Sequence, residues 1–414
     1  MVVLSKKDKN IEVSVALPAS KSISNRVLVI QFLMNNQFNI SNLSNCNDST
    51  QLKAALQQIH QSEQSIDINI GEAGTSYRFL TALLAVTPGN FTLSGASRLM
   101  QRPITPLVDA LRQLGADIQY KNTNQQGPLL INGKQLEGGT ITLNAHVSSQ
   151  FITALLLVAP YFRSGLKIFM SEKVVSFSYI LMTMQLMKHF GASVHFDKNM
   201  IQVIHQPYQV NFENYIVESD WTAASYWYAL AALSNQCTIS LQGLRKDSLQ
   251  GDSLLAPLFN IYGVHSSFEN NSVKLTKAKN TGVLTGFDFI DNPDLVQTFA
   301  FLNAALKAKL QVNEAGNLRL KETDRIAALK NELSKIGVTL HINSDNDFFI
   351  DGSNFSPKPN LIFETYQDHR MAMIAPIIAM QTNEIRIANE QVVSKSYPDY
   401  WNHLQQAGFT INFE

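Results

Sequence analysis

The feature that most constrains this chain is a repeated pattern: an amphipathic stretch, then a glycine, then a short stretch of alternating polarity. Five such glycines, Gly115, Gly191, Gly263, Gly337 and Gly408, follow one another at spacings of 76, 72, 74 and 71 residues. Glycine suits the residue just after a helix, where the backbone often turns left-handed, and the alternation is typical of a half-buried strand. An earlier stretch, residues 51–68, has both patterns without the glycine. The sequence therefore predicts six α/β repeats of about 70 residues each.

Six strongly apolar segments lie between these amphipathic stretches. Because they are apolar on nearly every side, each is predicted to be a helix buried inside a domain. The 414 residues fit two domains better than one, and three repeats per domain would give a central helix cluster wrapped by sheets and outer helices. The six segments are residues 23–34, 76–86, 149–160, 223–233, 295–306 and 369–380.

Each predicted buried helix begins with polar or charged residues. A helix N-terminus carries unpaired N–H groups and a partial positive charge, so it binds anions, although ordinary capping already explains the serines and aspartates. Capping does not explain cations at these starts, because a cation there opposes the helix dipole. A bound anion would remove that conflict; the alternative is that the cations are solvated surface charges. The cations are Lys21, Arg26, Arg78 and Arg370, with Arg102, Lys321, Arg325 and Lys395 near the amphipathic helices.

Composition excludes several classes of protein. Charged residues make up 16% of the chain, against about 25% in typical soluble domains, and 33 basic residues balance 33 acidic ones. We therefore expect no nucleic-acid partner. Residues 1–10 lack the apolar core of a signal peptide, and no apolar stretch approaches the roughly 20 residues of a membrane-spanning helix. We expect a cytoplasmic protein without a membrane partner.

Cofactor and nucleotide motifs are absent from the sequence. The two cysteines, Cys46 and Cys237, form no disulfide framework or zinc motif, and no GxGxxG occurs. The segment nearest to a phosphate-binding P-loop, residues 127–135, is one residue too long and has Gln135 after its lysine. No Ser/His/Asp or Cys/His set stands out. A zinc site and a nucleotide-dependent kinase are therefore disfavoured.

Two carboxylates, Asp294 and Glu322, stand among the cations. A carboxylate beside Lys and Arg can be a structural ion pair. Alternatively, cations that hold two anions together would bring the reactants close, and the carboxylates would serve as positioned acid and base groups. Residue type alone leaves both interpretations open.

Eight sequence segments in order resemble the 5-enolpyruvylshikimate-3-phosphate synthase family, the 3-phosphoshikimate 1-carboxyvinyltransferases. The resemblance runs from Leu17 to the C-terminus. The segments are LPASKSISNRVLV, EAGTSYRFLTALLA, QRPITPLVDALRQLGA, SSQFITALLL, DNPDLVQTFA, LRLKETDRIAAL, YQDHRMAM and SKSYPDYW.

This resemblance implies an α/β fold of the inside-out barrel type, with two similar domains of three βαβαββ units each and the active site in the cleft between them. We expect one domain to comprise residues 1–18 and 219–414, and the other residues 19–218. The implied reaction moves the enolpyruvyl group of phosphoenolpyruvate to the 5-hydroxyl of shikimate 3-phosphate through a tetrahedral ketal phosphate. It releases phosphate, uses no metal or cofactor, and belongs to the shikimate pathway to chorismate and aromatic amino acids. We expect a monomer.

The resemblance also assigns residues. Asp294 is implied to take the hydroxyl proton and Glu322 to supply a proton to the methylene carbon, with Lys21 as a third catalytic residue. Shikimate 3-phosphate would be bound by Lys21, Ser22, Arg26, Ser148, Ser149, Gln150, Ser176, Asp294, Asn317 and Lys321. Phosphoenolpyruvate would be bound by Lys21, Gly74, Arg102, Gln150, Arg325, Arg370 and Lys395.

Some positions depart from the family pattern. Glu72 stands where asparagine is expected, Phe79 where proline is usual, and residues 176–179 read Ser-Phe-Ser-Tyr instead of Ser-Lys-Pro-Tyr. These changes bear on substrate affinity and inhibitor response, not on the reaction. His369 could orient Arg370 or cap a helix. Two rival functions are the sister enolpyruvyl transferase that acts on UDP-N-acetylglucosamine and an inactive anion-binding protein; the two carboxylates argue against the second.

Overall fold

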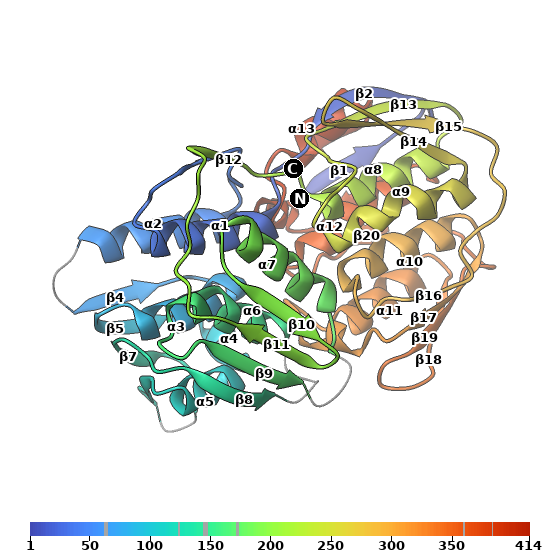
Figure 1. The fold of residues 1–414 in the computed structure, drawn as a ribbon. Helices are drawn as coiled ribbons and strands as arrows, with labels where there is room; N and C mark the ends of the chain where they lie inside the picture. The colour runs from blue at the N-terminus through green and yellow to red at the C-terminus, as the bar shows by residue number, and fades with distance from the viewer. Residues whose placement is uncertain (62–64, 123–124, 144–147, 171–173, 359–360, 383) are drawn as a thin grey trace. The chain divides into compact units, whose positions relative to one another are not determined.

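The computed structural model describes residues 1–414 except 62–64, 123–124, 144–147, 171–173, 359–360 and 383 (Figure 1). The chain forms two compact units. The continuous unit is Ser20–Val217, and the split unit combines Met1–Ala19 with Glu218–Glu414. Among the described residues, no helix combines the length and apolarity needed to cross a bilayer.

The continuous unit holds two complete repeats and one reduced repeat. In each complete repeat, strand, helix, strand, helix and two strands follow in sequence, and the sheet orders are β4-β5-β7-β6 and β8-β9-β11-β10. The first two strands are parallel and the other pairs are antiparallel. Its elements are α1 (Lys21–Leu33), β3 (Asn39–Ser41), α2 (Asn47–Gln61), β4 (Ile66–Asn69), α3 (Gly74–Val86), β5 (Gly89–Ser94), α4 (Ser97–Met100), α5 (Thr105–Gln113), β6 (Asp117–Tyr120), β7 (Leu129–Gly133), β8 (Gly139–Leu143), α6 (Ser149–Val158), η1 (Ala159–Tyr161), β9 (Leu166–Met170), α7 (Phe177–His189), β10 (Val194–Asp197), β11 (Met200–Val203) and β12 (Asn214–Ile216).

The split unit contains three four-stranded sheets with the same relative order: β2-β13-β15-β14, β16-β17-β19-β18 and β20-β21-β1-β22. The N-terminal strands β1 and β2 complete two of them. Its elements are β1 (Val2–Ser5), β2 (Ile11–Ala16), α8 (Trp221–Leu233), β13 (Cys237–Gln242), η2 (Gly251–Leu254), α9 (Leu255–Leu258), η3 (Phe259–Tyr262), β14 (Val264–Glu269), β15 (Ser272–Lys277), β16 (Gly286–Asp288), η4 (Pro293–Leu295), α10 (Val296–Ala305), β17 (Lys309–Asn313), η5 (Gly316–Leu320), α11 (Arg325–Lys335), β18 (Thr339–Ile342), β19 (Phe348–Asp351), β20 (Leu361–Phe363), α12 (His369–Ala379), β21 (Ile385–Ile387), η6 (Glu390–Lys395), α13 (Tyr400–Gln406) and β22 (Thr410–Phe413).

The strands that precede α1 and α8 are exchanged. Strand β2 leads into α1 but pairs in parallel with β13, the strand that follows α8. Strand β12 leads into α8 but pairs in parallel with β3, the strand that follows α1. Strand β2 therefore completes a sheet of the split unit although it leads into the continuous unit, and β12 does the reverse. This exchange explains why the N-terminal residues belong to the split unit.

The six predicted buried helices are confirmed as α1, α3, α6, α8, α10 and α12. In the split unit α8, α10 and α12 contact one another, and every residue of α8 and α10 is buried. In the continuous unit α1, α3 and α6 do the same. Their starts are thereby held close together inside each unit, which is the property that matters for the site.

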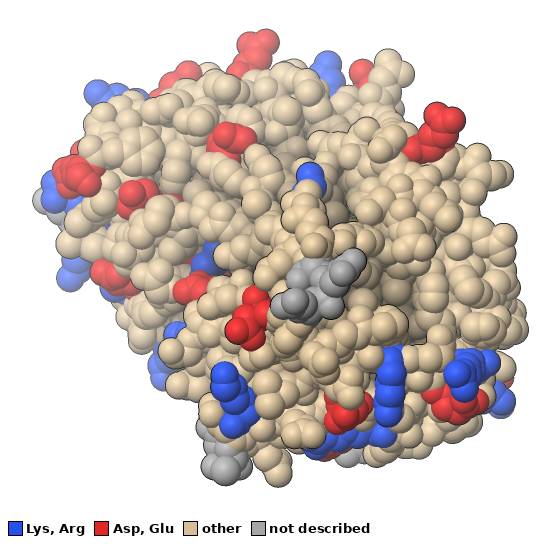
Figure 2. All heavy atoms as spheres, turned by 90° about the vertical axis from the view of Figure 1, so that its left-hand side faces the viewer, with Lys and Arg blue, Asp and Glu red and all other residues tan. Residues whose placement is uncertain are grey.

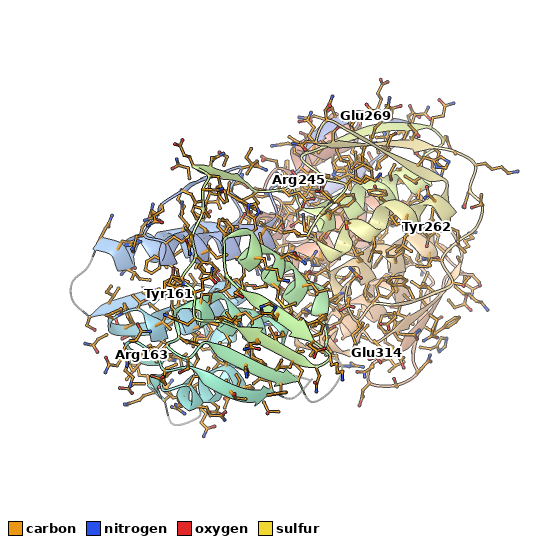
Figure 3. All side chains as sticks on the ribbon, viewed as in Figure 1. Tyr161, Arg163, Arg245, Tyr262, Glu269 and Glu314 are labelled. Carbon is orange, nitrogen blue, oxygen red and sulfur yellow. The ribbon has the colours of Figure 1, made fainter. Side chains whose placement is uncertain are left out.

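The outer shell is anchored by phenols labelled in Figure 3. Tyr161 in η1 donates its hydroxyl to the carbonyl of Leu33 at the end of α1, at 2.7 Å. The Tyr262 hydroxyl accepts from the Leu284 amide at 3.1 Å and from the Asn303 side chain at 3.0 Å. These bonds fix short outer segments against the buried helices.

All five repeat glycines have positive φ, between 71° and 99°, as a left-handed residue after a helix requires. The predicted amphipathic helix before Gly263 is nevertheless wrong as a regular helix. The segment is the four-residue α9 between the 3-10 helices η2 and η3. Pro257 lies inside it and lacks the N–H that a longer helix would need.

Surface charge is sparse, as the composition predicts. On the face shown in Figure 2, charged side chains stand singly or in small groups among broad areas of other residues. A dense group of charges is therefore informative wherever it occurs.

Candidate active site

A dense group of charges in the split unit centres on Arg325, the first residue of α11, whose side chain is 1% exposed. Its guanidinium donates to three carboxylates: Nε to Asp368 Oδ2 at 2.7 Å, Nη1 to Asp294 Oδ1 at 2.9 Å and Nη2 to Glu322 Oε2 at 2.9 Å. Arg370 adds a second cation, with Nη2 at 2.7 Å from Asp294 Oδ2. These five residues are called the Arg325 cluster below.

Three helix starts supply the Arg325 cluster. Asp294 lies in η4, which runs directly into α10. Asp324 caps α11 by accepting from the amides of residues 326 and 327, both at 3.1 Å, and so places Arg325 at the first helical position. Asp368 caps α12 by accepting from the Arg370 amide at 2.9 Å. The cluster thus forms where the inner helices α10 and α12 of two neighbouring repeats and the outer helix α11 begin.

The cluster sets the charge of Asp294. Burial raises the pKa of its carboxyl, but the guanidinium groups of Arg370 and Arg325 and the ammonium of Lys321 outweigh burial and hold that pKa well below its usual range. Burial lowers the pKa of Arg325, and the carboxylates of Asp368, Glu322 and Asp294 more than reverse that effect. Asp294 is therefore firmly ionised and Arg325 firmly protonated in this arrangement.

The other predicted residues of the split unit lie in or directly after 3-10 helices. Asn317 is in η5, and Lys321 directly follows it. Lys395 ends η6 and donates to the carbonyl of Gln367 at 3.2 Å, one residue before Asp368. Lys321 thus precedes α11, and Lys395 precedes α13, so neither lies within the helix. In the continuous unit, Arg102 likewise precedes α5.

In the continuous unit, Lys21 is the first residue of α1 and pairs with Asp48 in the first turn of α2, with Nζ to Oδ2 at 3.4 Å. Arg26 lies one turn further along α1 and is buried. Its guanidinium donates to the Ser22 carbonyl at 2.7 Å and to the Thr183 hydroxyl at 2.8 Å. Burial lowers the pKa of Arg26 to about 10. Lys21 and Ser22 thus lie at the start of α1, and hydrogen bonds hold the buried Arg26 side chain one turn further along the same helix.

The starts of α3 and α6 are linked. Ser148 caps α6 by accepting from the Gln150 amide at 3.3 Å, and the Gln150 side chain donates to Thr75 Oγ1 at 3.3 Å, near the start of α3. At Gly74, the first residue of α3, an added Cβ would lie 2.5 Å from Arg102 Nη1. Gly74, Arg102 and Gln150 are thus neighbours in the continuous unit.

Ser149 and Ser176 stand at helix starts in the same unit. Ser149 is the first residue of α6 and is buried. Ser176 precedes α7 and has a left-handed backbone with φ of 60°, which is uncommon for a residue other than glycine.

Two participants were missed from sequence. Asp368 is fully buried between Arg325 and the start of α12, and Asp48 is the partner of Lys21. Both occupy positions in helix starts where acidic residues are common, and that rule could have identified them. The N-cap of α12 is Asp368, and His369 is the first residue of that helix. No group of three or more His, Cys, Asp or Glu among the described residues has the arrangement of a metal site.

Comparison with solved structures places the fold among the enolpyruvyl transferases. The structure is similar to EPSP synthase from Acinetobacter baumannii, with a TM-score of 0.77, 18% identity and coverage of 100% of this chain and 99% of the other. It is also similar to the enolpyruvyl transferase NikO from Streptomyces tendae, with a TM-score of 0.72, 13% identity and coverage of 99% and 98%. The predicted two-domain α/β fold is thereby confirmed.

Sequence comparison gives the family. The model of the family described as EPSP synthase (3-phosphoshikimate 1-carboxyvinyltransferase) matches residues 5–404. A 3-phosphoshikimate 1-carboxyvinyltransferase of Bacteroides fragilis is 44% identical over 402 residues, covering 97% of this chain and 96% of the relative. One from Vibrio cholerae is 32% identical over 426 residues, covering 95% and 96%. The chain belongs to the EPSP synthase family, as its eight ordered segments predict.

Proposed function

We propose that this enzyme transfers the enolpyruvyl group of phosphoenolpyruvate to the 5-hydroxyl of shikimate 3-phosphate, giving 5-enolpyruvylshikimate 3-phosphate and phosphate. Its family and its relatives carry the name of this transferase. The observation that supports the chemistry most directly is that Asp294 and Glu322 share one buried guanidinium, that of Arg325. An ionised acceptor and a second titratable group next to cations suit a reaction that needs a base, an acid and bound anions.

The two substrates each carry a phosphate and a carboxylate, and we assign the cations accordingly. Shikimate 3-phosphate binds at the starts of α1 and α6 and at Ser176, with Asp294, Asn317 and Lys321 completing the set. Phosphoenolpyruvate binds to Lys21, the backbone of Gly74, Gln150 and the cations Arg102, Arg325, Arg370 and Lys395. Arginine suits these anions because its planar fork donates two parallel hydrogen bonds to one carboxylate or phosphate.

In the proposed addition, Asp294 takes the proton from the 5-hydroxyl as that oxygen bonds to the second carbon of phosphoenolpyruvate. Glu322 gives its proton to the methylene carbon, which becomes a methyl group, and Lys21 stabilises the charge that develops. The product of this step is a tetrahedral ketal phosphate. In the elimination, Glu322 takes a proton back from the methyl group while the carbon–oxygen bond to phosphate breaks, and the proton held by Asp294 passes to the leaving phosphate.

The Arg325 cluster explains how the two carboxylates acquire their roles. Without an anion, Arg325 and Arg370 stabilise the ionised Asp294, which makes it a weak base. An anionic substrate that accepts hydrogen bonds from these arginines withdraws them from the carboxylates and adds negative charge nearby. Both effects raise the pKa values of Asp294 and Glu322, because each carboxylate loses part of its cation. Asp294 becomes a stronger base, and Glu322 becomes protonated and able to act as an acid.

The decisive assay measures phosphate release from phosphoenolpyruvate in the presence of shikimate 3-phosphate. Asp294→Asn and Glu322→Gln should each lower kcat at least about 10²-fold while the protein stays folded. In heavy water, deuterium should enter the methylene group of phosphoenolpyruvate with the parent protein and not with Glu322→Gln. Absence of phosphate release at high enzyme and substrate would refute the function, and unchanged kcat would remove the substituted residue from the mechanism.

The remaining assignments belong to the same proposal. The enzyme works as a cytoplasmic monomer without a metal or cofactor. The rival function, transfer to UDP-N-acetylglucosamine, is tested in the same assay with that acceptor in place of shikimate 3-phosphate. Cys46 and Cys237 are both buried, so neither is placed as an active-site thiol of that sister enzyme.

A further inference from the structure

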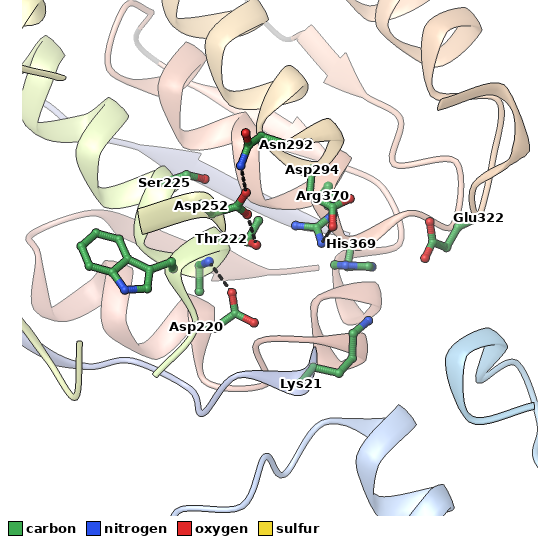
Figure 4. Close-up of polar contacts among 12 residues, drawn as sticks. Lys21, Asp220, Thr222, Ser225, Asp252, Asn292, Asp294, Glu322, His369 and Arg370 are labelled. Carbon is green, nitrogen blue, oxygen red and sulfur yellow. Dashed lines mark hydrogen bonds and ion pairs between the residues drawn. The ribbon is translucent and has the colours of Figure 1, made fainter. Parts of the chain in front are cut away.

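Outside the Arg325 cluster, the split unit contains further buried carboxylates, and one of them is Asp252, in η2. Its side chain lies between two neutral donors: Oδ1 accepts from Asn292 Nδ2 at 2.9 Å and Oδ2 from Thr222 Oγ1 at 2.5 Å (Figure 4). The residue is 5% exposed, and its carboxylate forms no ion pair with any described residue. A buried carboxylate without a cation is costly, so the two hydrogen bonds are what make the position tolerable.

One of these donors controls the turn that carries Asp294. Asn292 is buried and lies two residues before Asp294, with Pro293 between them. Its carbonyl accepts from the Leu295 amide at 3.1 Å, which closes the 3-10 turn η4. Because proline fixes φ at residue 293, the direction of the turn depends mainly on how residue 292 is held. The bond from Asn292 to Asp252 holds it.

The other side of Asp252 is tied to the start of α8. Thr222 is the second residue of α8, and Gln250 accepts from the Trp221 amide at 3.1 Å while donating to the Ser219 carbonyl at 2.8 Å. Hydrogen bonds therefore hold the segment that bears Asp252 against the start of α8. In Figure 4 the Asp252 carboxylate lies between Thr222 on α8 and Asn292 on the loop leading to Asp294.

We propose that Asp252 is a positioning residue for Asp294: it anchors Asn292 and thereby holds the η4 turn where both Asp294 oxygens reach Arg325 and Arg370. This inference rests on the proposed role of Asp294. Burial, with the nearby charge of Asp294, raises the pKa of Asp252 to about 6, and Arg370 is the cation that acts against it. At neutral pH the ionised carboxylate offers an acceptor to each of its two donors.

The test compares two substitutions at one position. In Asp252→Asn, the amide oxygen still accepts from Asn292, and the amide NH₂ donates to Thr222 Oγ1 once that hydroxyl rotates. This variant should keep kcat within about threefold of the parent protein. In Asp252→Ala, Asn292 loses its acceptor and the turn is released. Its kcat should fall roughly 10- to 100-fold, with KM for either substrate changed much less, because a misplaced base affects the chemical step more than binding.

Two further variants keep the test decisive. Asn292→Ala removes the donor and leaves the Asp252–Thr222 bond, so it should reproduce the loss of Asp252→Ala, and the double variant should be no worse than either single one. Ser225→Ala is the matched control: Ser225 is also buried on α8 and bonds Thr298 Oγ1 at 2.9 Å, but it does not touch the turn. Its kcat should stay unchanged.

The outcomes separate the two proposals. If the parent protein releases no phosphate, the proposed function is wrong. If the parent protein is active and a folded Asp252→Ala or Asn292→Ala variant has an unchanged kcat, only the positioning role is wrong. An equal loss of kcat in Asp252→Asn and Asp252→Ala would also overturn it, since the charge and not the hydrogen bond would then matter.

Discussion

Replacing Arg325 with alanine tests whether the Arg325 cluster stabilises the split unit. The change leaves three carboxylates without their shared cation, and one of them, Asp368, is fully buried. Removing one partner of a buried ion pair costs about 3–5 kcal/mol, and the partly exposed Glu322 adds little. We therefore expect the free energy of unfolding to fall by at least about 3 kcal/mol. With a denaturant slope of about 3 kcal/mol per molar urea, the midpoint falls by roughly 1 M.

The measurement is urea unfolding followed by tryptophan fluorescence. The three tryptophans, Trp221, Trp227 and Trp401, all lie in the split unit, so the signal reports on that unit alone. Arg319→Ala is the control, because Arg319 pairs at 3.6 Å with Asp324 in a partly exposed site that is worth less than about 1 kcal/mol. If the free energy of unfolding falls no further in Arg325→Ala than in this control, the reasoning is refuted.

The pH dependence of Arg325→Ala gives a second check. In the parent protein the depressed pKa of Asp294 contributes stability above its ordinary value of 3.8, and this is lost only as pH falls through the folded value. Without Arg325, Asp294 keeps Arg370 and Lys321 but loses one of the cations that lower its pKa, so that pKa rises. The deficit relative to the parent should therefore shrink as pH falls through the raised pKa of Asp294 in the variant. A deficit that grows on acidification would contradict this account.

Two other predictions concern single sites. Gly74→Ala places a Cβ 2.5 Å from Arg102 Nη1, and displacing that guanidinium should raise KM for phosphoenolpyruvate about 10-fold or more, leaving KM for shikimate 3-phosphate unchanged; steady-state kinetics in both substrates decides. Asp252→Asn removes a carboxyl whose pKa burial raises from 3.8 to about 6. A raised folded pKa gives stability that is present below 3.8 and lost as pH rises through 6, so the asparagine variant should gain up to roughly 3 kcal/mol on the parent between about pH 4 and pH 8 in urea unfolding. No gain would contradict the buried charge.

Much of the fold could be predicted because local sequence patterns indicate the helices and strands of each repeat. The buried helices are apolar all round, and Gly115, Gly191, Gly337 and Gly408 end regular outer helices with positive φ. The exchange of β2 and β12 could not be predicted from these patterns. The sequence of a short strand does not specify which strand it pairs with, because pairing depends on the rest of the sheet.

The candidate site shows the same division between local and non-local information. Glu322 could be singled out because Lys321 and Arg325 are close by in the sequence, and Asp294 because it lies at the start of a predicted buried helix and in one of the eight family-like segments. Their convergence on one guanidinium could not, since residues 294, 322 and 368 meet only when α10, α11 and α12 begin side by side. Asp252 gave no signal at all, because its partners Thr222 and Asn292 are neutral and distant along the chain.

The charges of the Arg325 cluster also constrain how it can bind an anion. Its three carboxylates, Asp294, Glu322 and Asp368, outnumber the two guanidinium groups of Arg325 and Arg370, so the cluster alone has no excess positive charge. Binding a further anion there requires either an additional cation or the neutralisation of a carboxylate. Lys321 and Lys395 supply cations in the same unit, and protonation of Glu322 removes one negative charge. Under the proposed mechanism, the state that best accepts phosphoenolpyruvate is therefore also the state in which Glu322 carries the proton for the addition step.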